Sequence, residues 1–286
     1  MEIRIDGKKA GIILESETTL GEVLTGIYTW LGDSGFFISG LEVDGTVYNS
    51  RSMEGAFDLP LAGINTIDIT TSLWTELMME ALGGLRQDIE SHMAGEKKQP
   101  EEWGSSPVAL FLEKNSPELY DLAVKTLQGD VPPENTLTLV LERIREAENP
   151  EQEIAKTAVL AKEIAQRLED LPLDMQTGKD SRAAETITLF SPLVEKIYRL
   201  LFLFRQLGAD IKTITVEPES SDPVTLKDYM DEFGAVLGEF SAAYENKDTV
   251  LVGDLAEYEL APRLVRICGA LCGIKAGKEA GEKKQG

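Results

Sequence analysis

Alternating apolar and polar positions open the chain. Ile3 and Ile5 alternate with charged neighbours before a turn at Asp6-Gly7, and a second apolar run covers residues 12–14. A period of two on both sides of an Asp-Gly turn is typical of a β-hairpin. The pattern therefore predicts two short antiparallel strands at the N-terminus.

A helix and three further strands follow within the first 72 residues. Thr19 and Glu22 have the spacing of a capping box, and apolar residues then recur at helical intervals as far as Leu31. The period returns to two in 36–43, 46–48 and 64–69, and residues 49–63 read as loops, with a turn at Asp44-Gly45. The predicted order is β-β-α-β-β-β.

From residue 73 onward the apolar period is helical almost to the end of the chain. Residues 73–148 read as a helical connecting region that contains a linker at 99–107. Residues 149–274 read as long amphipathic helices joined by polar turns, which predicts a helical bundle with a loop at 172–180. The Gly- and Lys-rich residues 275–286 are expected to be a flexible tail.

Two prolines interrupt otherwise continuous helical patterns in the predicted bundle. Pro192 and Pro262 each lack a backbone N–H and would clash with the preceding turn. Each is therefore expected to kink or split its helix.

The element order, the length and the two Asp-Gly turns together resemble a ubiquitin-like β-grasp domain over residues 1–72. The segments LPLDMQTGKD and ENKDTVLVGDLAEYELAP look like an uncharacterised bacterial helical family. The expected fold class is α+β, with an N-terminal β-grasp domain followed by an all-α helical-bundle region. The resemblance implies that the sheet face is presented to other proteins, since β-grasp domains commonly bind in this way.

Charge narrows the classes of partner. The chain has 28 Lys and Arg against 50 Asp and Glu, a formal net charge of −22. This charge repels phosphate backbones and anionic membranes, so nucleic-acid binding and attraction to membrane surfaces are not expected. Membrane insertion is not expected either, because charged residues interrupt the longest apolar stretch, 187–207. A protein with a basic or amphipathic surface is the expected partner.

The N-terminus lacks the basic flank and unbroken apolar stretch of a secretory signal. Cys268 and Cys272, four residues apart, then read as reduced thiols, and a redox pair is the alternative. These features predict a cytoplasmic protein.

The composition and motifs of the chain limit the kinds of metal, cofactor and anion site that it could form. One histidine and two cysteines cannot supply the four ligands of a structural zinc site, and no cofactor motif is present, so neither a metal nor a cofactor is predicted. Gly178 and Lys179 precede a helix whose N-terminal N–H groups could hold an anion. They lack the upstream glycines of a phosphate loop, and a simple turn before a helix cap is the other interpretation.

An acidic segment near the C-terminus carries the main polar candidates, which are Asp248, Asp254, Glu257, Tyr258 and Glu259. Carboxylates within an apolar helical stripe require partners, because burial disfavours their charged form. Three interpretations remain: ion pairs with Lys or Arg of a neighbouring helix, a surface that recognises a partner, or a site for a hard oxygen-liganded ion such as Mg²⁺.

Two further patterns have both a structural and a functional interpretation. The stripe Tyr229, Phe233, Phe240 and Tyr244 is typical of core, but it would also suit a helix-in-groove contact if part of it stays exposed. The triplet 82–84, Leu-Gly-Gly, resembles the diglycine tail of ubiquitin-like proteins, although close packing of two helices explains it equally.

These observations favour a non-catalytic protein-interaction or scaffold (adaptor) protein. The alternative is an enzyme or ligand-binding protein that uses the acidic segment, for which the carboxylates would have to converge on a solvent-reachable pocket. No catalytic residue is assigned.

Overall fold

The computed structural model describes residues 1–14, 16–32, 36–48, 53–96, 98–209, 213–216 and 223–274. The predicted flexible tail, 275–286, lies outside these ranges. The chain divides into two compact units, unit 1 over Met1–Ala147 and unit 2 over Glu148–Gly286. Each unit is described by itself.

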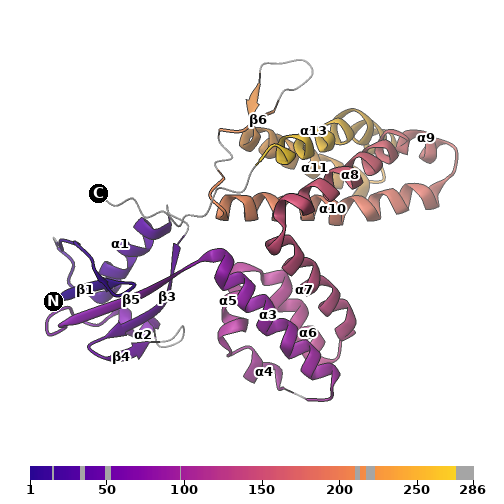
Figure 1. Cartoon of the computed structure of the whole chain (residues 1–286). Coiled ribbons are helices and arrows are strands. Elements are labelled where there is room, and N and C mark those ends of the chain that lie inside the picture. Colours follow the sequence, from indigo (N-terminus) through magenta and orange to yellow (C-terminus); the bar gives the residue numbers. More distant parts are fainter. Residues whose placement is uncertain are drawn as a thin grey trace. The chain divides into compact units, whose positions relative to one another are not determined.

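A mixed five-stranded sheet forms the N-terminal part of unit 1 (Figure 1). Its order is β2-β1-β5-β3-β4, with β1 parallel to β5 and the other neighbours antiparallel. The strands are β1 (Glu2–Ile5), β2 (Lys8–Lys9), β3 (Phe36–Val43), β4 (Thr46–Tyr48) and β5 (Thr66–Leu73).

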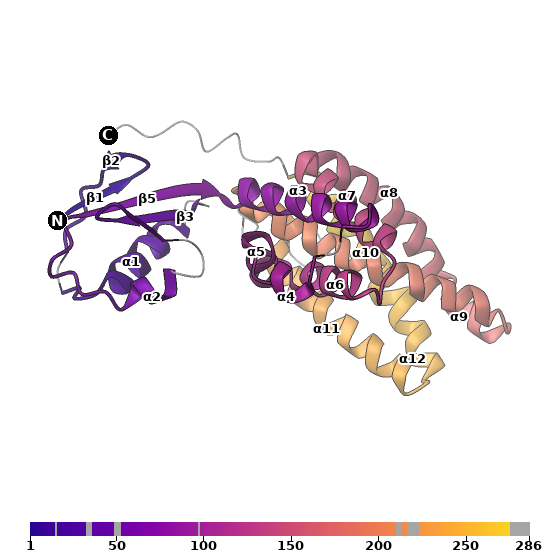
Figure 2. The same cartoon turned by 90° about the horizontal axis from the view of Figure 1, so that it is seen from below.

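The pairing register places the apolar positions of three strands on one face. Ile67 of β5 lies between Ile3 of β1 and Val43 of β3, and all three are buried. Helices α1 (Leu20–Gly32) and α2 (Met53–Phe57) lie on the same side of the sheet (Figure 2). Burial of this face against α1 supplies the hydrophobic core of the sheet domain.

The N-terminus of α1 has the predicted capping box. The Glu22 backbone N–H donates to Thr19 Oγ1 at 3.4 Å, and the Thr19 N–H donates to the Glu22 carboxylate at 3.2 Å. Backbone N–H groups at Thr18 and Thr19 lower the pKa of the Glu22 carboxyl, because they bond to its charged form.

The second predicted strand is wrong in position, and the loop at 49–63 contains the short helix α2. Asp6 and Gly7 both adopt positive φ, so the turn is tight and pairs Ile5 directly with Lys8. Residues 12–14 form no strand, and Ile13 is 85% exposed. The geometry of the turn sets the register between β1 and β2, whereas the apolar run predicted that the second strand starts later, at residue 12.

The face of the sheet opposite α1 is charged. The register aligns one residue from each strand in a row across it, and these residues are Lys9, Arg4, Asp68, Glu42 and Val47. Arg4 pairs with Glu2 at 2.7 Å and with Asp68 at 3.7 Å. This face is therefore polar, and its basic residues lie toward the β2 edge.

Helices make up the rest of unit 1. They are α3 (Trp74–Met93), α4 (Pro100–Trp103), α5 (Pro107–Asn115), α6 (Pro117–Gln128) and α7 (Pro133–Glu148). The predicted linker at 99–107 is wrong, because its centre forms α4 and Trp103 is only 1% exposed. Trp103 stacks on Tyr120 and donates from Nε1 to Asp88 at 2.8 Å, so this segment belongs to the core.

Unit 2 is built mainly from helices, with a short hairpin of β6 (Thr215–Val216) and β7 (Val224–Thr225). Its helices are α8 (Pro150–Glu169), α9 (Leu171–Gln176), α10 (Asp180–Gln206), α11 (Leu226–Glu245), α12 (Thr249–Asp254), the π-helix η1 (Leu255–Leu260) and α13 (Ala261–Cys272). Helix α8 packs against α10 and α13. Most of the predicted loop 172–180 is the short helix α9, whose Leu171 and Asp174 are buried.

The two prolines behave differently. Helix α10 continues through Pro192, so it is not split there. Pro262 lies in the first turn of α13, directly after η1, in which the Ala261 N–H donates to Ala256 O five residues back. A widened turn before a proline relieves the clash of its ring with the carbonyl four residues earlier.

The described residues thus form a mixed α+β structure, with an N-terminal mixed sheet followed by a mostly helical region. The expected fold class is confirmed at that level.

Gly83 and Gly84 of α3 provide a test of close helix packing. A Cβ at Gly84 would lie 2.6 Å from Val108 Cγ2 of α5, whereas a Cβ at Gly83 would meet nothing within 4 Å. Gly83→Ala should stabilise unit 1 by about 0.5–1 kcal/mol through helix propensity. Gly84→Ala should be less stable than Gly83→Ala by about 1–3 kcal/mol, because Val108 must shift.

Urea unfolding followed by tryptophan fluorescence measures both, since all three tryptophans, Trp30, Trp74 and Trp103, lie in unit 1. Equal stability of the two variants would contradict the close contact between α3 and α5.

Candidate functional site

Helices α10 and α11 are joined by the β6–β7 hairpin and run in opposite directions. Phe190 packs against Phe240, while Tyr198, two turns further along α10, donates its hydroxyl to Met230 O at 3.4 Å, earlier in α11. Thr225 caps α11 by accepting the Asp228 N–H at 3.1 Å. The hairpin and this cap set where α11 begins.

A groove of about 310 Å³ lies between α10 and α11. Both helices contribute residues at the spacings i, i+3, i+4 and i+7, which bring side chains to one face. The floor is aromatic, because Phe190 and Phe240 pack edge to face with their ring centroids 6.2 Å apart. The lining consists of Ile187, Phe190, Ser191, Val194, Glu195, Leu237, Phe240, Ser241 and Tyr244.

The aromatic stripe predicted for this region is divided between core and surface. Tyr229, Phe233 and Phe240 are buried, whereas Tyr244 is 49% exposed. Tyr198 on α10 is 38% exposed, and partial burial, with the nearby charge of Asp231, raises the pKa of its phenol. Part of the stripe thus forms an accessible wall of the groove.

The predicted acidic residues occupy the outer side of α12 and η1. Asp248 is exposed and caps α12 by accepting the Leu251 N–H at 3.1 Å. Asp254 and Tyr258 are exposed, and Glu257 is half-buried. A hydrogen bond with Glu257, together with the charges of Glu257 and Asp254, raises the pKa of the Tyr258 phenol.

Glu259 instead takes part in an ion-pair network. Arg263 contacts Glu259 at 3.0 Å and Glu232 of α11 at 3.1 Å, and its guanidinium lies 5.3 Å from the ring centre of Tyr229. These carboxylates raise the pKa of Arg263 against the opposing effect of burial. None of the five acidic-segment residues lines the groove between α10 and α11.

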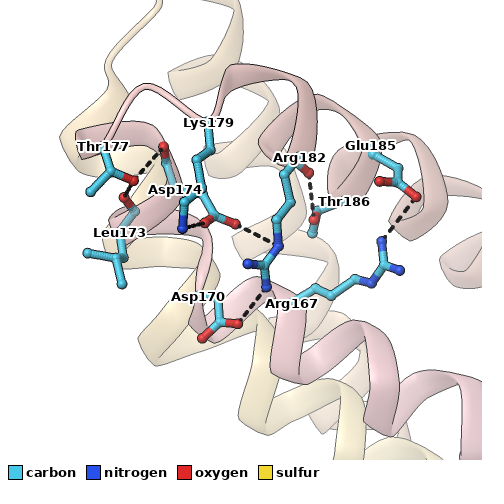
Figure 3. A network of polar contacts seen from close by, with 9 residues as sticks. All are labelled: Arg167, Asp170, Leu173, Asp174, Thr177, Lys179, Arg182, Glu185 and Thr186. Atoms are coloured by element: carbon cyan, nitrogen blue, oxygen red, sulfur yellow. Dashed lines mark hydrogen bonds and ion pairs between the residues drawn. The ribbon is translucent and has the colours of Figure 1, made fainter.

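The anion-binding candidates, Gly178 and Lys179, lie between α9 and α10. Figure 3 shows Lys179 with its contact to Asp174. Gly178 has a positive φ of 72°, as the turn after α9 requires. The Lys179 ammonium lies 3.3 Å from Oδ1 of the buried Asp174, and Arg182 Nε lies 3.1 Å from Asp174 Oδ2 as an ion pair without hydrogen-bond geometry. Arg182 also contacts Asp170 at 2.8 Å. Lys179 therefore neutralises an internal carboxylate, and anion binding at this turn stays a prediction.

A second buried carboxylate links α8 to α10. Glu153 is 5% exposed and contacts Lys156 at 2.7 Å and Lys196 at 3.1 Å. Hydrogen bonds from these two ammonium groups lower the pKa of Glu153 against the cost of desolvation.

Both cysteines lie on α13, where Cys268 is buried and Cys272 is exposed. Cys268 and Cys272 are both free, and burial raises the pKa of Cys268 to about 12, so its thiol stays protonated at neutral pH. Within the described ranges, no group of three or more His, Cys, Asp or Glu side chains is placed to hold a metal ion. None of the helices in these ranges has the length and apolar character needed to cross a bilayer.

Sequence reasoning missed the groove itself. The aromatic stripe of α11 indicated an apolar face, but no local pattern paired this face with the side of α10 that carries Ile187, Ser191 and Glu195. A signal was present in Ser241, a small residue that follows Leu237 and Phe240 at helical spacing and precedes Tyr244 by three residues.

The Asp174 network generates a stability test. Asp174→Asn keeps the shape but removes the charge that Lys179 and Arg182 contact, so it should destabilise α9 and the start of α10 by about 1–3 kcal/mol. Asp170→Asn, which alters a half-exposed ion pair, should cost less than about 1 kcal/mol. Hydrogen exchange of peptides from α9 and α10 measures both, and similar exchange in the two variants would show that Asp174 does not hold this turn.

Glu153 should make unit 2 sensitive to acid. Its pKa in the folded chain lies below the ordinary value of 4.5, so the ionised group stabilises the fold above pH 4.5 and that contribution is lost as pH falls below 4.5. Glu153→Gln should therefore be less stable than the parent at pH 7, with a smaller difference at pH 3. Glu163→Gln, at an exposed site of the same helix, is the control. Circular dichroism across urea series at the two pH values measures the differences, and parallel losses in parent and Glu153→Gln would contradict this role.

Comparison with known proteins divides the chain in two. The family described as the TP0873 N-terminal domain matches residues 1–72, and a domain of unknown function, DUF8042, matches residues 152–268. No solved structure shows significant similarity to the chain.

An uncharacterized protein of Treponema pallidum (strain Nichols) is 30% identical to this chain over 106 residues. The match covers 37% of this chain and 49% of the relative, so the chain spans about half the length of the curated relative it matches. The expected similarity to uncharacterized bacterial proteins is thus confirmed, while none of these descriptions names a β-grasp fold.

Proposed function

We propose that this protein is a non-catalytic interaction protein, an adaptor that acts in the cytoplasm. The observation that carries the proposal is the groove between α10 and α11, in which Tyr244 and the half-buried Ile187, Val194 and Leu237 remain accessible on a chain of net charge −22. Grooves with apolar residues at helical spacing are one of the recurring ways in which proteins bind a partner's helix. The two free cysteines suit a reducing compartment.

The proposal extends to the N-terminal sheet, which we interpret as a ubiquitin-like β-grasp domain. Support comes from the strand order β2-β1-β5-β3-β4, from the parallel pairing of β1 with β5, and from α1 covering one face. Its uncovered face carries the charged row from Lys9 to Glu42, which would suit polar contacts at a rim. The adaptor would then offer one surface in each unit.

The enzyme alternative requires the acidic segment to converge on a pocket. Asp248 caps a helix, Glu259 pairs with Arg263, and Asp254 and Tyr258 are exposed. This arrangement lends no support to the alternative, which remains an outcome of the test.

Native mass spectrometry of the tagged full-length chain, purified gently from its own host without chelator, tests the proposed function. We expect a stoichiometric polypeptide partner, which in-cell crosslinking should also capture. A chain that stays bare in both measurements would overturn the proposal. A stoichiometric metal or small molecule that is lost in the double variant Asp254→Lys/Glu257→Lys, with folding intact, would favour the enzyme or ligand-binding class instead.

A further inference from the structure

The groove between α10 and α11 has a shape into which a third helix can pack. Its walls are the faces of two antiparallel helices, and their lining residues recur at helical spacing on both sides. A helix bound between them can place residues at i, i+3, i+4 and i+7 into such a seam. The groove presents no strand edge, so an extended peptide would find no ladder of backbone hydrogen bonds there.

Small residues leave room for close approach. Ser191 and Ser241 are exposed and face the groove from opposite helices. Gly238, one turn before Ser241, lies inside α11 with nothing within 4 Å of where its Cβ would be. A glycine inside a helix costs about 1 kcal/mol relative to alanine, and the packing of this chain does not require one at this position. Gly238 lies outside the lining itself.

The surroundings of the groove are acidic. Glu195 is exposed and lines the groove directly, and Glu245 lies one turn beyond Ser241. Asp231, near the other end, acts electrostatically on Tyr198. Elsewhere on α11, Asp231 pairs with Lys227 at 2.6 Å and Glu232 pairs with Arg263 at 3.1 Å, whereas Glu239 is exposed.

We propose that this groove binds a basic amphipathic α-helix of another protein. Apolar residues of the bound helix would fill the space over Phe190 and Phe240, and its Lys or Arg residues would lie beside Glu195 and Glu245. The inference rests on the proposed interaction function and names the chemical class of the partner. Charge complementarity selects a basic partner over a second copy of this acidic chain, because like charges would face each other across a self-contact.

A synthetic peptide serves as the probe. It has about 18 residues, or five helical turns, with Leu at i, i+3, i+4 and i+7 and Lys elsewhere. Fluorescence anisotropy with the full-length chain at about 0.15 M salt measures its affinity, since this ionic strength screens non-specific attraction between exposed charges. A scrambled peptide of the same composition and a version with Glu in place of Lys are the peptide controls.

Two matched pairs of variants locate the binding site. Ser241→Arg blocks the groove, whereas Ala242→Arg adds the same charge at the next exposed position of α11, outside the lining. Glu195→Lys reverses a groove charge, and Glu239→Lys reverses an exposed charge of α11 outside the lining. We expect Ser241→Arg and Glu195→Lys each to weaken binding about tenfold or more, with the controls within about threefold of the parent.

Circular dichroism verifies that each variant folds, which is expected because all four sites are exposed. Equal affinities across each pair, or equal binding of the scrambled peptide, would overturn the proposal. Analytical ultracentrifugation supplies a further test. If the parent chain self-associates and Ser241→Arg abolishes this self-association, a second copy occupies the groove and the proposal is overturned.

The same variants separate this proposal from the general one. If a polypeptide co-purifies from the host and Ser241→Arg retains it as well as Ala242→Arg does, the adaptor function stands and the groove assignment fails. If the Leu–Lys peptide binds in the expected pattern but no polypeptide is captured, the groove assignment stands and the adaptor function fails.

Discussion

The ion pair between Glu153 of α8 and Lys196 of α10 sets how α10 presents its faces. Glu153 is buried and contacts two cations, Lys156 of its own helix at 2.7 Å and Lys196 of α10 at 3.1 Å, so the side of α10 that carries Lys196 faces α8. Successive residues of a helix differ by about 100° in direction, so Glu195 lies on a different side of α10 from Lys196. In this orientation Glu195 lines the groove. A single buried charge thus helps to decide which side chains α10 leaves accessible.

Several Lys and Arg side chains of unit 2 form ion pairs with carboxylates of the same unit. Lys179 and Arg182 contact the buried Asp174, and Arg263 contacts Glu259 and Glu232. In each of these contacts a positive side chain balances a negative one. The surplus of Asp and Glu over Lys and Arg, which gives the chain its net charge of −22, remains. That excess favours association with positively charged surfaces, and it is the reason why the partner proposed for the groove is a basic helix.

The structure differs from the sequence-based predictions at positions where contacts between distant segments, or the geometry of a turn, outweigh the local pattern of apolar and polar residues. The β2 strand begins at Lys8 because the tight turn at Asp6-Gly7 fixes its register, whatever the apolar run at 12–14 suggests. The polar segment around Trp103 becomes part of the core, because one large side chain finds a stacking partner in Tyr120. The anion-binding candidate Lys179 contacts Asp174, a carboxylate whose burial no local pattern revealed.

Sequence by itself determined the alternation of strand and helix, the capping of α1, the mixed α+β class and the acidity of the surface, since these depend on neighbours along the chain and on summed charge. Only the tertiary structure decided that Phe240 is buried while Tyr244, four residues later in the same stripe, is half exposed. Helical spacing places both residues on one face of α11. How much of that face is buried depends on how far along α11 the side chains of α10 cover it. This is a property of packing between segments that are far apart in sequence.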